Sequence, residues 1–565
     1  MIDYRERPFY LKDEDIQWVE DTYAGMSEEE KIGQLFCPIE FSNREEDLKR
    51  LVETKHIGGV LFREGKGEEI LDSHRCLQKY SKIPLLTASN LEFGGTGSAV
   101  EGTYYGRQML VAATGNVERA YQLGKVSCRE GAAVGVNWAF APVVDIDRNF
   151  RNPIVNVRTF GDDKDRVKQM GSAYQRAATE EGLAVSIKHF PGDGIDERDQ
   201  HLLTSVNTLS CEEWDASYGD IYRTLIEQGA LTVMVGHIAL PAYEEHFDGK
   251  PCEQVIPATL SKNILQKLLR EKLGFAGLIS TDASPMTGFC SAMERRLSVP
   301  LAIEYGCDMF PFNRDLDEDI AYMTEGYHKG ILSEGRLTEA VKRILATKAA
   351  LGLHRKQKEG TLVPGRKALS VLRCEEHDAW AKACADEGIT LVKDTQNLLP
   401  ITPERHNRVL LEVMGGFPSD GRVKESVKEL LEKEGFTVTI YEPEELGEFG
   451  VKFDTVEEFR AKYDLVLYVG NVETASNKTV ARLNWHTLFG LGNNMPWFVH
   501  EVPTIFVSVG NPYHLLDAPM IKTYINGYCN SEYVLSGVVE KLVGKSTFKG
   551  VSPVDAFCGR WDTKL

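Results

Sequence analysis

The fold of this chain can be read outward from the stretch AVSIKHFPGDG at residues 184–194. A short apolar, β-branched run ends there in polar residues and glycines, and a helical pattern follows. The first 350 residues contain eight such runs, at 32–38, 57–63, 84–90, 136–144, 185–190, 231–238, 277–282 and 307–312. Strands that alternate with helices pair in parallel, so eight of them predict a closed (β/α)8 barrel of the TIM type.

The rest of the chain predicts a second α/β domain. An amphipathic helical pattern at 320–353, broken at Gly330 and Gly335, closes the first half, and residues 352–367 are polar, basic and rich in glycine. Further strands are expected at 409–414, 436–441, 464–470, 504–510 and 523–528, separated by helices. We therefore expect a barrel over 1–353, a linker over 354–372 and a C-terminal doubly wound αβα sandwich over 373–565.

Composition narrows the class of protein. With 565 residues, 42% hydrophobic and 26% charged, the chain is neither collagen-like nor disordered. Its net charge of −19 repels phosphate groups, which argues against nucleic acid and anionic membranes as partners. The N-terminus is charged, with no apolar core after it, so we expect no secretory signal and a cytoplasmic location. The 11 cysteines form no Cys-x-x-Cys pair, so a zinc site is not indicated.

The loop at the end of the 185–190 run carries the densest group of candidate catalytic residues. In a barrel, such groups stand at the carboxyl ends of the strands. Lys188 and His189 end this strand, and Asp199 and His201 follow in the loop. In an extended loop residues i and i+2 lean to one side, so Asp199 is expected to hydrogen-bond the His201 imidazole and orient it for proton transfer. The alternative is a solvated charged loop.

Two further strand ends carry acidic residues. Asp282 ends the 277–282 run and could be a nucleophile, a metal ligand or the N-cap of the next helix. Asp145 and Asp147 could bind a hard cation, but nearby arginines favour a salt-bridged structural loop, with Arg158 as a polar ligand contact. His237 either lines the pocket or is a packed barrel histidine.

Several motifs together resemble glycoside hydrolase family 3, in its β-N-acetylglucosaminidase branch. They are Lys-His-Phe-Pro-Gly at 188–192 with Asp-x-His at 199–201, Ala-Pro-Val-x-Asp at 141–145, Arg-Thr-Phe-Gly at 158–161 and Ser-Thr-Asp at 280–282. The resemblance extends through Gly-Ile-Thr-Leu-Val-Lys-Asp at 388–394 and Gly-Asn-Pro-Tyr at 510–513. It therefore covers nearly the whole chain.

The resemblance implies a role for each matching residue. Asp282 would be the nucleophile that forms a covalent glycosyl-enzyme, and His201, held by Asp199, the general acid/base. Contacts to the sugar hydroxyls would come from Lys188, His189 and Arg158. After it gives up its proton this acid/base is neutral, whereas a carboxylate would be anionic and would repel an anionic acceptor.

Two positions depart from the family's pattern. The branch usually has Gly-His-Gly where this chain has Gly192-Asp193-Gly194, which changes the charge beside the catalytic loop. Asn90 stands where the family usually has an aspartate that binds a sugar hydroxyl. An asparagine still donates and accepts hydrogen bonds but lacks the charge. The preferred hexosamine therefore stays open, including its 4-hydroxyl configuration.

The implied function is a retaining exo-β-N-acetylhexosaminidase that removes terminal N-acetylglucosamine from small amino-sugar glycosides such as muropeptide or chitin-type fragments. No cofactor is expected, because the Gly95-Thr96-Gly97 stretch lacks the full dinucleotide-binding pattern, and no metal is expected either. The alternatives are a phosphorylase, a β-N-acetylgalactosaminidase or β-glucosidase of the same family, and an inactive sugar-binding relic. The sequence leaves the oligomeric state open.

Overall fold

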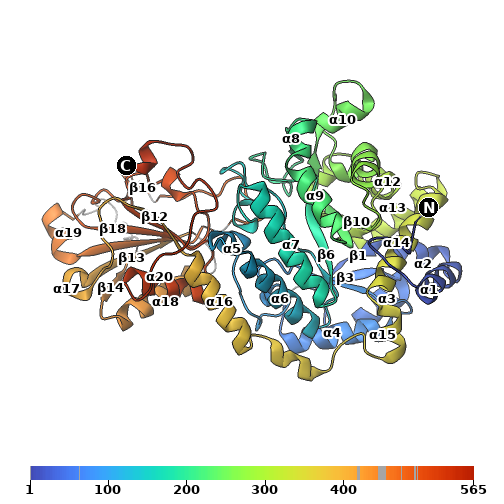
Figure 1. Ribbon diagram of the computed structural model, residues 1–565, viewed down its shortest axis with the longest axis horizontal. Coiled ribbons are helices and arrows are strands. Elements are labelled where there is room, and N and C mark those ends of the chain that lie inside the picture. Colours follow the sequence, from blue (N-terminus) through green and yellow to red (C-terminus); the bar gives the residue numbers. More distant parts are fainter. Residues whose placement is uncertain are drawn as a thin grey trace. The chain divides into compact units, whose positions relative to one another are not determined.

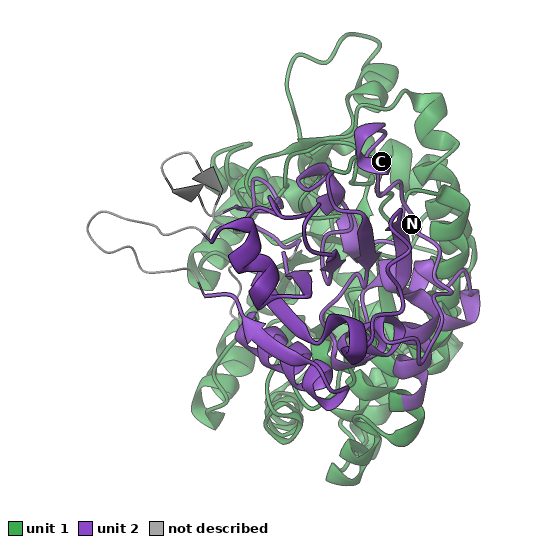
Figure 2. Ribbon diagram, turned by 90° about the vertical axis from the view of Figure 1, so that its left-hand side faces the viewer, with its two compact units in different colours: residues 1–105, 120–155, 162–378 green, residues 106–119, 156–161, 379–565 purple. Residues whose placement is uncertain are grey.

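The computed structural model describes residues 2–62, 64–415, 420–442, 454–472, 474–485, 487–488, 491–492 and 494–565. Arg63, the last residue of the predicted run 57–63, lies outside them. The chain divides into two compact units, which Figure 2 shows in different colours. The first holds residues 1–105, 120–155 and 162–378, and the second holds 106–119, 156–161 and 379–565. The second unit therefore takes in two short segments from the first third of the chain.

The first unit is an eight-stranded parallel barrel, and each predicted run contributes a strand. The strands are β1 (Phe36–Cys37) continued by β2 (Ile39–Glu40), β3 (Gly59–Phe62), β4 (Leu86–Ser89), β5 (Trp138–Ala139), β6 (Ala184–Phe190), β8 (Thr232–Val235), β10 (Leu278–Thr281) and β11 (Phe310–Pro311). Seven pair in the order β10-β8-β6-β5-β4-β3-β2, and β1 pairs with β11. Backbone hydrogen bonds from Gly58 to Phe36 and from Thr281 to Met309 close the ring.

Large apolar side chains fill the barrel, as the near-continuous apolar strands require. Every residue of β6 is buried. The Trp138 ring meets Phe140 edge-on at 4.6 Å between centroids, and Phe140 meets Phe312 at 5.8 Å. The Trp138 indole N–H donates to the Thr232 hydroxyl at 2.8 Å, so its one polar atom is satisfied in the core.

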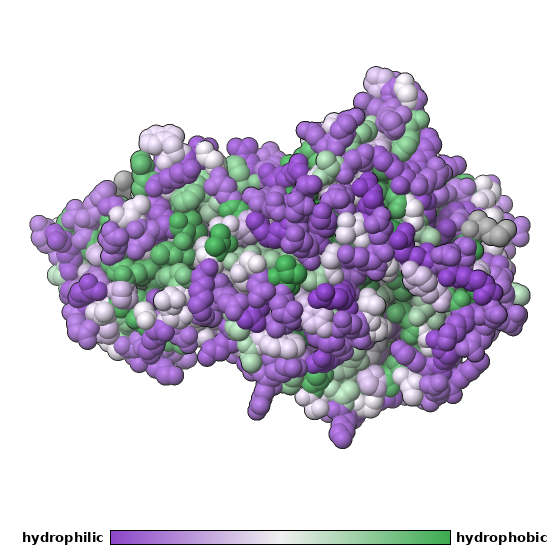
Figure 3. Space-filling view, in the orientation of Figure 1, coloured by the Kyte–Doolittle hydropathy of each residue, from purple (hydrophilic) through white to green (hydrophobic). Residues whose placement is uncertain are grey.

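Helices surround these strands (Figure 1). The main ones are α3 (Glu45–Lys55), α4 (Gly67–Tyr80), α6 (Val117–Ala133), α7 (Lys164–Glu180), α9 (Tyr218–Glu227), the π-helix η4 (Asn263–Lys272), α12 (Arg295–Tyr305), α13 (Leu316–His328) and α14 (Glu334–Ala350). Shorter ones are α1 (Asp13–Ala24), α2 (Glu28–Gln34), α8 (Cys211–Asp215), α10 (Pro241–Asp248) and α11 (Thr287–Cys290). The helix α5 (Gln108–Ala113) belongs to the second unit. Hydrophilic residues gather over the helices α7 and α9 in the space-filling view of Figure 3.

Two predicted boundaries differ from the structure. The run 32–38 begins as the end of α2, and its strand starts only at Phe36. The two breaks predicted at Gly330 and Gly335 are a single break, between α13 and α14. Gly330 adopts a φ of +73° after α13, and the Ser333 hydroxyl accepts from the Arg336 N–H to cap α14. Gly335 lies inside the first turn of α14.

The predicted linker, 354–372, contains the helix α15 (Leu353–Glu359) and the 3-10 helix η5 (Arg366–Val371). The helix α16 (Glu375–Gly388) follows, and the second unit takes up the chain within it, at residue 379. No helix among the described residues is both long enough and apolar enough to cross a membrane.

The second unit contains a six-stranded sheet. Its strands are β12 (Thr390–Asp394), β13 (Arg408–Met414), β14 (Thr437–Ile440), β15 (Leu465–Gly470), β18 (Thr504–Ser508) and β19 (Thr523–Asn526), in the order β12-β19-β18-β15-β13-β14. All five predicted strands are present, and β12 is an additional one. It runs antiparallel to β19, while the other pairs are parallel.

The chain winds in both directions from β13, as the prediction of a doubly wound sheet requires. It passes through α18 (Asp420–Lys433) to β14 on one side, and then through α19 (Val456–Lys462) to β15 on the other. The last helix, α20 (Glu532–Leu542), follows β19. The direction of winding therefore reverses between β13 and β15.

Candidate active site

Asp282 follows the last residue of β10 and lies at the carboxyl end of the barrel. Its backbone N–H donates to the Val235 carbonyl at 2.8 Å, which joins it to the neighbouring strand β8. Oδ1 accepts from the Ala283 N–H at 2.7 Å, whereas buried Oδ2 accepts no hydrogen bond from any described residue. The next helix, α11, has Met286 as its N-cap, so Asp282 does not cap it.

The charge around Asp282 keeps its carboxylate ionised. The residue is 7% exposed, and burial by itself would raise its pKa. The charges of His189, His237 and His201, together with the hydrogen bond from the Ala283 N–H, outweigh burial and lower the pKa below its ordinary value. A buried carboxylate with one oxygen free of hydrogen bonds has the properties that a nucleophile needs.

His189 links Asp282 to a second buried carboxylate. Its Nδ1 lies 2.7 Å from Asp145 Oδ2, and its Nε2 lies 3.9 Å from Asp282 Oδ2. Asp145 Oδ1 accepts from the backbone N–H groups of His189 and Asp193. Asp145 therefore holds the His189 ring and the backbone of Asp193, which is a structural role of the kind predicted for it.

Lys188 points to another partner, which the sequence did not reveal. Its Nζ lies 2.8 Å from Glu92 Oε1, and both side chains are less than one-tenth exposed. Glu92 follows β4, as does Asn90, so the ion pair joins the ends of β4 and β6. Glu92 follows a predicted strand by two residues, and that position is the one signal that could have identified it.

The loop after β6 contains the predicted Asp–His pair. His201 Nδ1 lies 2.7 Å from Asp199 Oδ1, and the same oxygen accepts from the His201 backbone N–H at 2.9 Å. The two residues are in a turn, closed by the Leu202 N–H on the Asp199 carbonyl, and not in the extended loop assumed from the sequence. Because the Asp199 carboxylate accepts a hydrogen bond from Nδ1–H, Nε2 is left for a substrate.

This loop is tied to the segment that follows Asp282. The His201 carbonyl accepts from the N–H of Thr287, the first residue of α11, at 2.9 Å. Gly288 has room for no side chain here, because a Cβ would lie 2.4 Å from the Gln200 carbonyl oxygen. The backbones of the two segments therefore lie in contact, which positions His201 on the same barrel end as Asp282.

Asp193 and His237 are buried beneath the site, where they hydrogen-bond its backbone segments. Asp193 is 3% exposed and accepts hydrogen bonds from Gly194 N–H and the Asn152 amide, so it does not change the charge at an open surface. His237 is fully buried, with Nδ1 at 3.0 Å from the Thr259 hydroxyl and Nε2 at 3.0 Å from the Ala283 carbonyl. It is a packed barrel histidine that holds the residue next to Asp282.

Gln200 was missed by the sequence reasoning. Its Oε1 accepts from the His237 backbone N–H at 2.7 Å and its Nε2 lies 3.5 Å from Asp193 Oδ2. It therefore joins the catalytic loop to the end of β8. Its position between Asp199 and His201 was the one feature of the sequence that could have indicated this role.

The structure brings together Asp282, His189, Lys188 and the Asp199–His201 pair at the strand ends of the first unit, with Asn90 after β4. Arg158 lies at the end of the 3-10 helix η2 (Asn156–Arg158), in a segment that groups with the second unit, and its role stays a prediction. Among the described residues, no group of three or more histidines, cysteines or carboxylates could hold a metal ion.

Comparison with known proteins identifies relatives among the glycoside hydrolases. Residues 27–347 match the family described as the glycosyl hydrolase family 3 N terminal domain. A Cellulomonas fimi protein named beta-N-acetylglucosaminidase/beta-glucosidase is 47% identical over 573 residues, which cover 100% of both chains. A beta-hexosaminidase from Neisseria meningitidis is 28% identical over 281 residues, which cover 48% of this chain and 74% of that protein.

Solved structures share the whole architecture. The beta-glucoside phosphorylase BglX bound to 2FGlc has a TM-score of 0.93 at 42% identity, over 99% of this chain and 100% of that one. A family 3 beta-N-acetylglucosaminidase from Paenibacillus has a TM-score of 0.77 at 22% identity, over 95% and 100% of the two chains, and so shares the fold. With the family match over the barrel and a relative alike along its full length, this chain belongs to glycoside hydrolase family 3.

Proposed function

We propose that the protein is a retaining exo-β-N-acetylhexosaminidase that removes a terminal β-linked N-acetylglucosamine from small glycosides. The observation that carries the proposal is Asp282, an ionised carboxylate at the barrel's strand ends with Oδ2 free of hydrogen bonds from any described residue. His201 lies on the same barrel end, with Nδ1 bonded to Asp199. The name of the Cellulomonas fimi relative supports the same activity.

The reaction follows from these two groups. Asp282 Oδ2 attacks the anomeric carbon and the bond to the leaving oxygen breaks, while His201 Nε2–H gives its proton to that oxygen. The sugar is then held by an ester to Asp282. A water molecule gives a proton back to His201 and attacks the same carbon, which releases the sugar with retained configuration and restores the carboxylate.

A second candidate function is phosphorolysis of the same intermediate. After the first step His201 is neutral, so it does not repel a phosphate dianion as a carboxylate would. The likeness to a structure described as a beta-glucoside phosphorylase favours this candidate. The two activities share every step up to the glycosyl ester and differ only in the acceptor, water or phosphate.

The sugar specificity is proposed from the residues around the glycone. The Lys188–Glu92 pair offers a charged donor and a charged acceptor to sugar hydroxyls, and Asn90 offers a neutral amide. The double name of the Cellulomonas fimi relative keeps glucose as an alternative to N-acetylglucosamine. We therefore place N-acetylglucosamine first and glucose second.

Trapping of the intermediate tests the proposal. A 2-fluoro or 5-fluoro glycosyl fluoride should add its sugar mass to the peptide that contains Asp282, and the Asp282→Asn variant should stay unlabelled. A label on a different peptide, or none on an enzyme that turns over aryl glycosides, would overturn the assignment of the nucleophile.

Product analysis then separates the acceptors and the sugars. Turnover of p-nitrophenyl glycosides that differ at the 2-substituent and the 4-hydroxyl, with and without phosphate, should give free N-acetylglucosamine as the main product. Sugar 1-phosphate as the main product would favour the phosphorylase. A glucoside turned over faster than the N-acetylglucosaminide would contradict the proposed sugar.

A further inference from the structure

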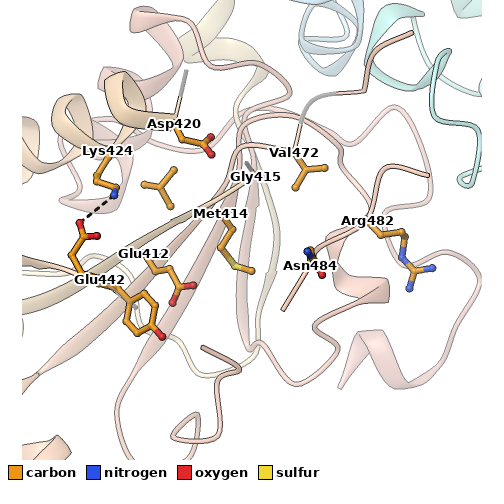
Figure 4. A pocket seen from close by; sticks show the side chains of 11 residues that line it. Glu412, Met414, Gly415, Asp420, Lys424, Glu442, Val472, Arg482 and Asn484 are labelled. Atoms are coloured by element: carbon orange, nitrogen blue, oxygen red, sulfur yellow. Dashed lines mark hydrogen bonds and ion pairs between the residues drawn. The ribbon is translucent and has the colours of Figure 1, made fainter. Parts of the chain in front are cut away.

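A cavity lies within the second unit, at the carboxyl ends of β13 and β14 (Figure 4). Its volume is about 310 Å³, within the range of small-molecule sites. Its described lining includes Glu412, Gly415, Asp420, Lys424, Arg482 and Asn484. No catalytic residue proposed above lies in this cavity, and the names of the related proteins give it no function.

The cavity occupies the place where doubly wound sheets bind ligands. It lies beyond the ends of β13 and β14 and beside Val472, in the connection after β15, where the winding reverses. Gly415 shows how close the two connections come. A Cβ there would lie 2.4 Å from the Asn471 carbonyl oxygen, so only glycine fits.

Glu412 gives the cavity a buried carboxyl group. It lies on β13 and is 5% exposed, whereas the Glu442 side chain is 71% exposed. Oε1 accepts from the Asn494 amide at 2.5 Å, the one hydrogen bond of this side chain to a described residue, and the Tyr468 hydroxyl bonds the Asn494 carbonyl. Burial raises the pKa of Glu412 to about 8, so at neutral pH the group is mostly protonated.

The other charges around the cavity are already matched. Lys424 Nζ lies 3.3 Å from Glu442 Oε1, on the opposite side of the cavity from Arg482 in Figure 4. Arg482 Nε donates to Asp517 at 2.6 Å. Asp420 accepts from the Asn471 amide at 2.6 Å. Both cations among the described lining residues are therefore engaged by carboxylates, and no cation among them faces Glu412 within ion-pair distance.

We propose that this cavity binds a small organic ammonium compound, with the ammonium group against Glu412 and its hydroxyl or amide groups against Asp420 and Asn484. An anionic ligand is disfavoured, because both described cations of the lining are already paired and the buried end of the cavity holds a carboxyl group. The described carboxylates do not form a group that could hold a metal ion. An ammonium ion supplies the positive charge and the donors that Glu412 otherwise lacks.

Such binding should release the proton that Glu412 carries. An ammonium group favours the ionised form of Glu412, so the bound ligand displaces the proton that this carboxyl carries at pH 7, about one per site. Asp282 is already ionised, since its pKa is lowered. An amine beside Asp282 would act on the nearby histidines instead, so variants of Glu412 and Asp282, together with proton release, tell the two sites apart.

The experiment is a calorimetric titration of the full chain with 2-aminoethanol at pH 7, in two buffers that differ in ionisation heat. Ethylene glycol serves as the neutral counterpart. We expect binding of the amine with release of about one proton and at least tenfold weaker binding of the glycol. No binding of the amine, binding without proton release, or equal binding of the glycol would each overturn the proposal.

Two matched variants locate the site. Glu412→Gln keeps an acceptor for Asn494 but cannot ionise, so it should lose the proton release and at least tenfold in affinity. Asp282→Asn should retain both. The reverse pattern would place the amine in the barrel. Should the Gln variant not fold, hydrogen exchange of the unmodified chain decides, because the amine should protect β13 and α18, and protection confined to barrel peptides would contradict the proposal.

Discussion

Asp282 and Glu412 are two buried carboxyl groups at comparable positions in their own units. Each lies at or near the carboxyl end of a strand that pairs in parallel with its neighbours, Asp282 just beyond β10 and Glu412 in the second half of β13, and they are 7% and 5% exposed. Burial by itself would raise the pKa of each. The outcomes differ, because the pKa of Asp282 ends below its ordinary value and that of Glu412 rises to about 8.

The neighbours explain this difference. Three histidines and a backbone N–H act on Asp282, while Glu412 receives a single neutral amide hydrogen bond from Asn494 among the described residues. Similar strand-end positions therefore give an ionised carboxylate in one unit and a protonated acid in the other. The position in the fold supplies burial, and the side chains around it decide the charge.

The largest expected effect comes from removing the carboxylate of Asp282. Asp282→Asn should lower kcat on an aryl glycoside by at least about 10³-fold, because an amide cannot form the glycosyl ester. Asp13→Asn makes the same chemical change at a side chain that is 83% exposed and should keep the original rate. If kcat fell less than tenfold in Asp282→Asn, Asp282 would not be the nucleophile, and its contrast with Glu412 would have no catalytic meaning.

The proton donor comes next. His201→Ala should lower kcat/KM by about 10²- to 10⁴-fold for glycosides with poor leaving groups, because those need protonation as the bond breaks. Dinitrophenyl glycosides should lose much less. Asp199→Asn should show the same ranking with a smaller loss, because the ring keeps a hydrogen-bond partner. Equal losses for both kinds of leaving group would argue against His201 as the acid.

Glu412 should make the stability of the second unit depend on pH. Its folded pKa, about 8, lies above that of an unfolded glutamate, so its contribution is fully present below pH of about 4 and is lost as pH rises through 8. The slope in between should reach about 1.4 kcal/mol per pH unit. Urea unfolding followed by hydrogen exchange of β13 at pH 5 to 8 measures it.

Glu412→Gln should remove this slope, because an amide does not titrate. Glu429→Gln, on the exposed side of α18, is the control and should keep it. A wild-type protein whose second unit is equally stable at pH 5 and pH 8 would show that Glu412 is ionised like Asp282.

The smallest effect concerns the histidines around Asp282. The nucleophile must be ionised, so the acid limb of kcat/KM that it causes lies below its ordinary pKa. His189→Asn removes the largest of the interactions that lower the pKa of Asp282, so burial should raise that pKa and move this limb to higher pH. His328→Asn, at an exposed position on α13, should not move it. A profile of kcat/KM from pH 3 to 7 measures the shift.

Local pattern was sufficient to predict much of this protein. The eight apolar runs predicted the strands of the barrel, because a strand buried on both faces needs continuous apolar residues. The Asp199–His201 hydrogen bond was also predictable, since residues two apart are close in almost any backbone conformation, although here a turn and not an extended loop brings them together.

Contacts between distant segments could not be predicted in this way. Lys188 pairs with Glu92, His189 with Asp145, and Gln200 with the His237 backbone, each across many residues of chain. The partner depends on strand order and register, which follow from how the whole barrel closes. The extra strand β12 was missed because its side chains are only partly buried and its run is mixed in polarity.

The sequence by itself determined which residues form strands and helices and which polar residues follow them, because apolar periodicity and turn residues act over a few neighbouring positions. Only the tertiary structure decided the charge of Asp282 and Glu412, because a pKa depends on burial and on charges that the fold brings from other strands. For the same reason the cavity beside Glu412 left no recognisable motif, since three separate connections of the sheet build it.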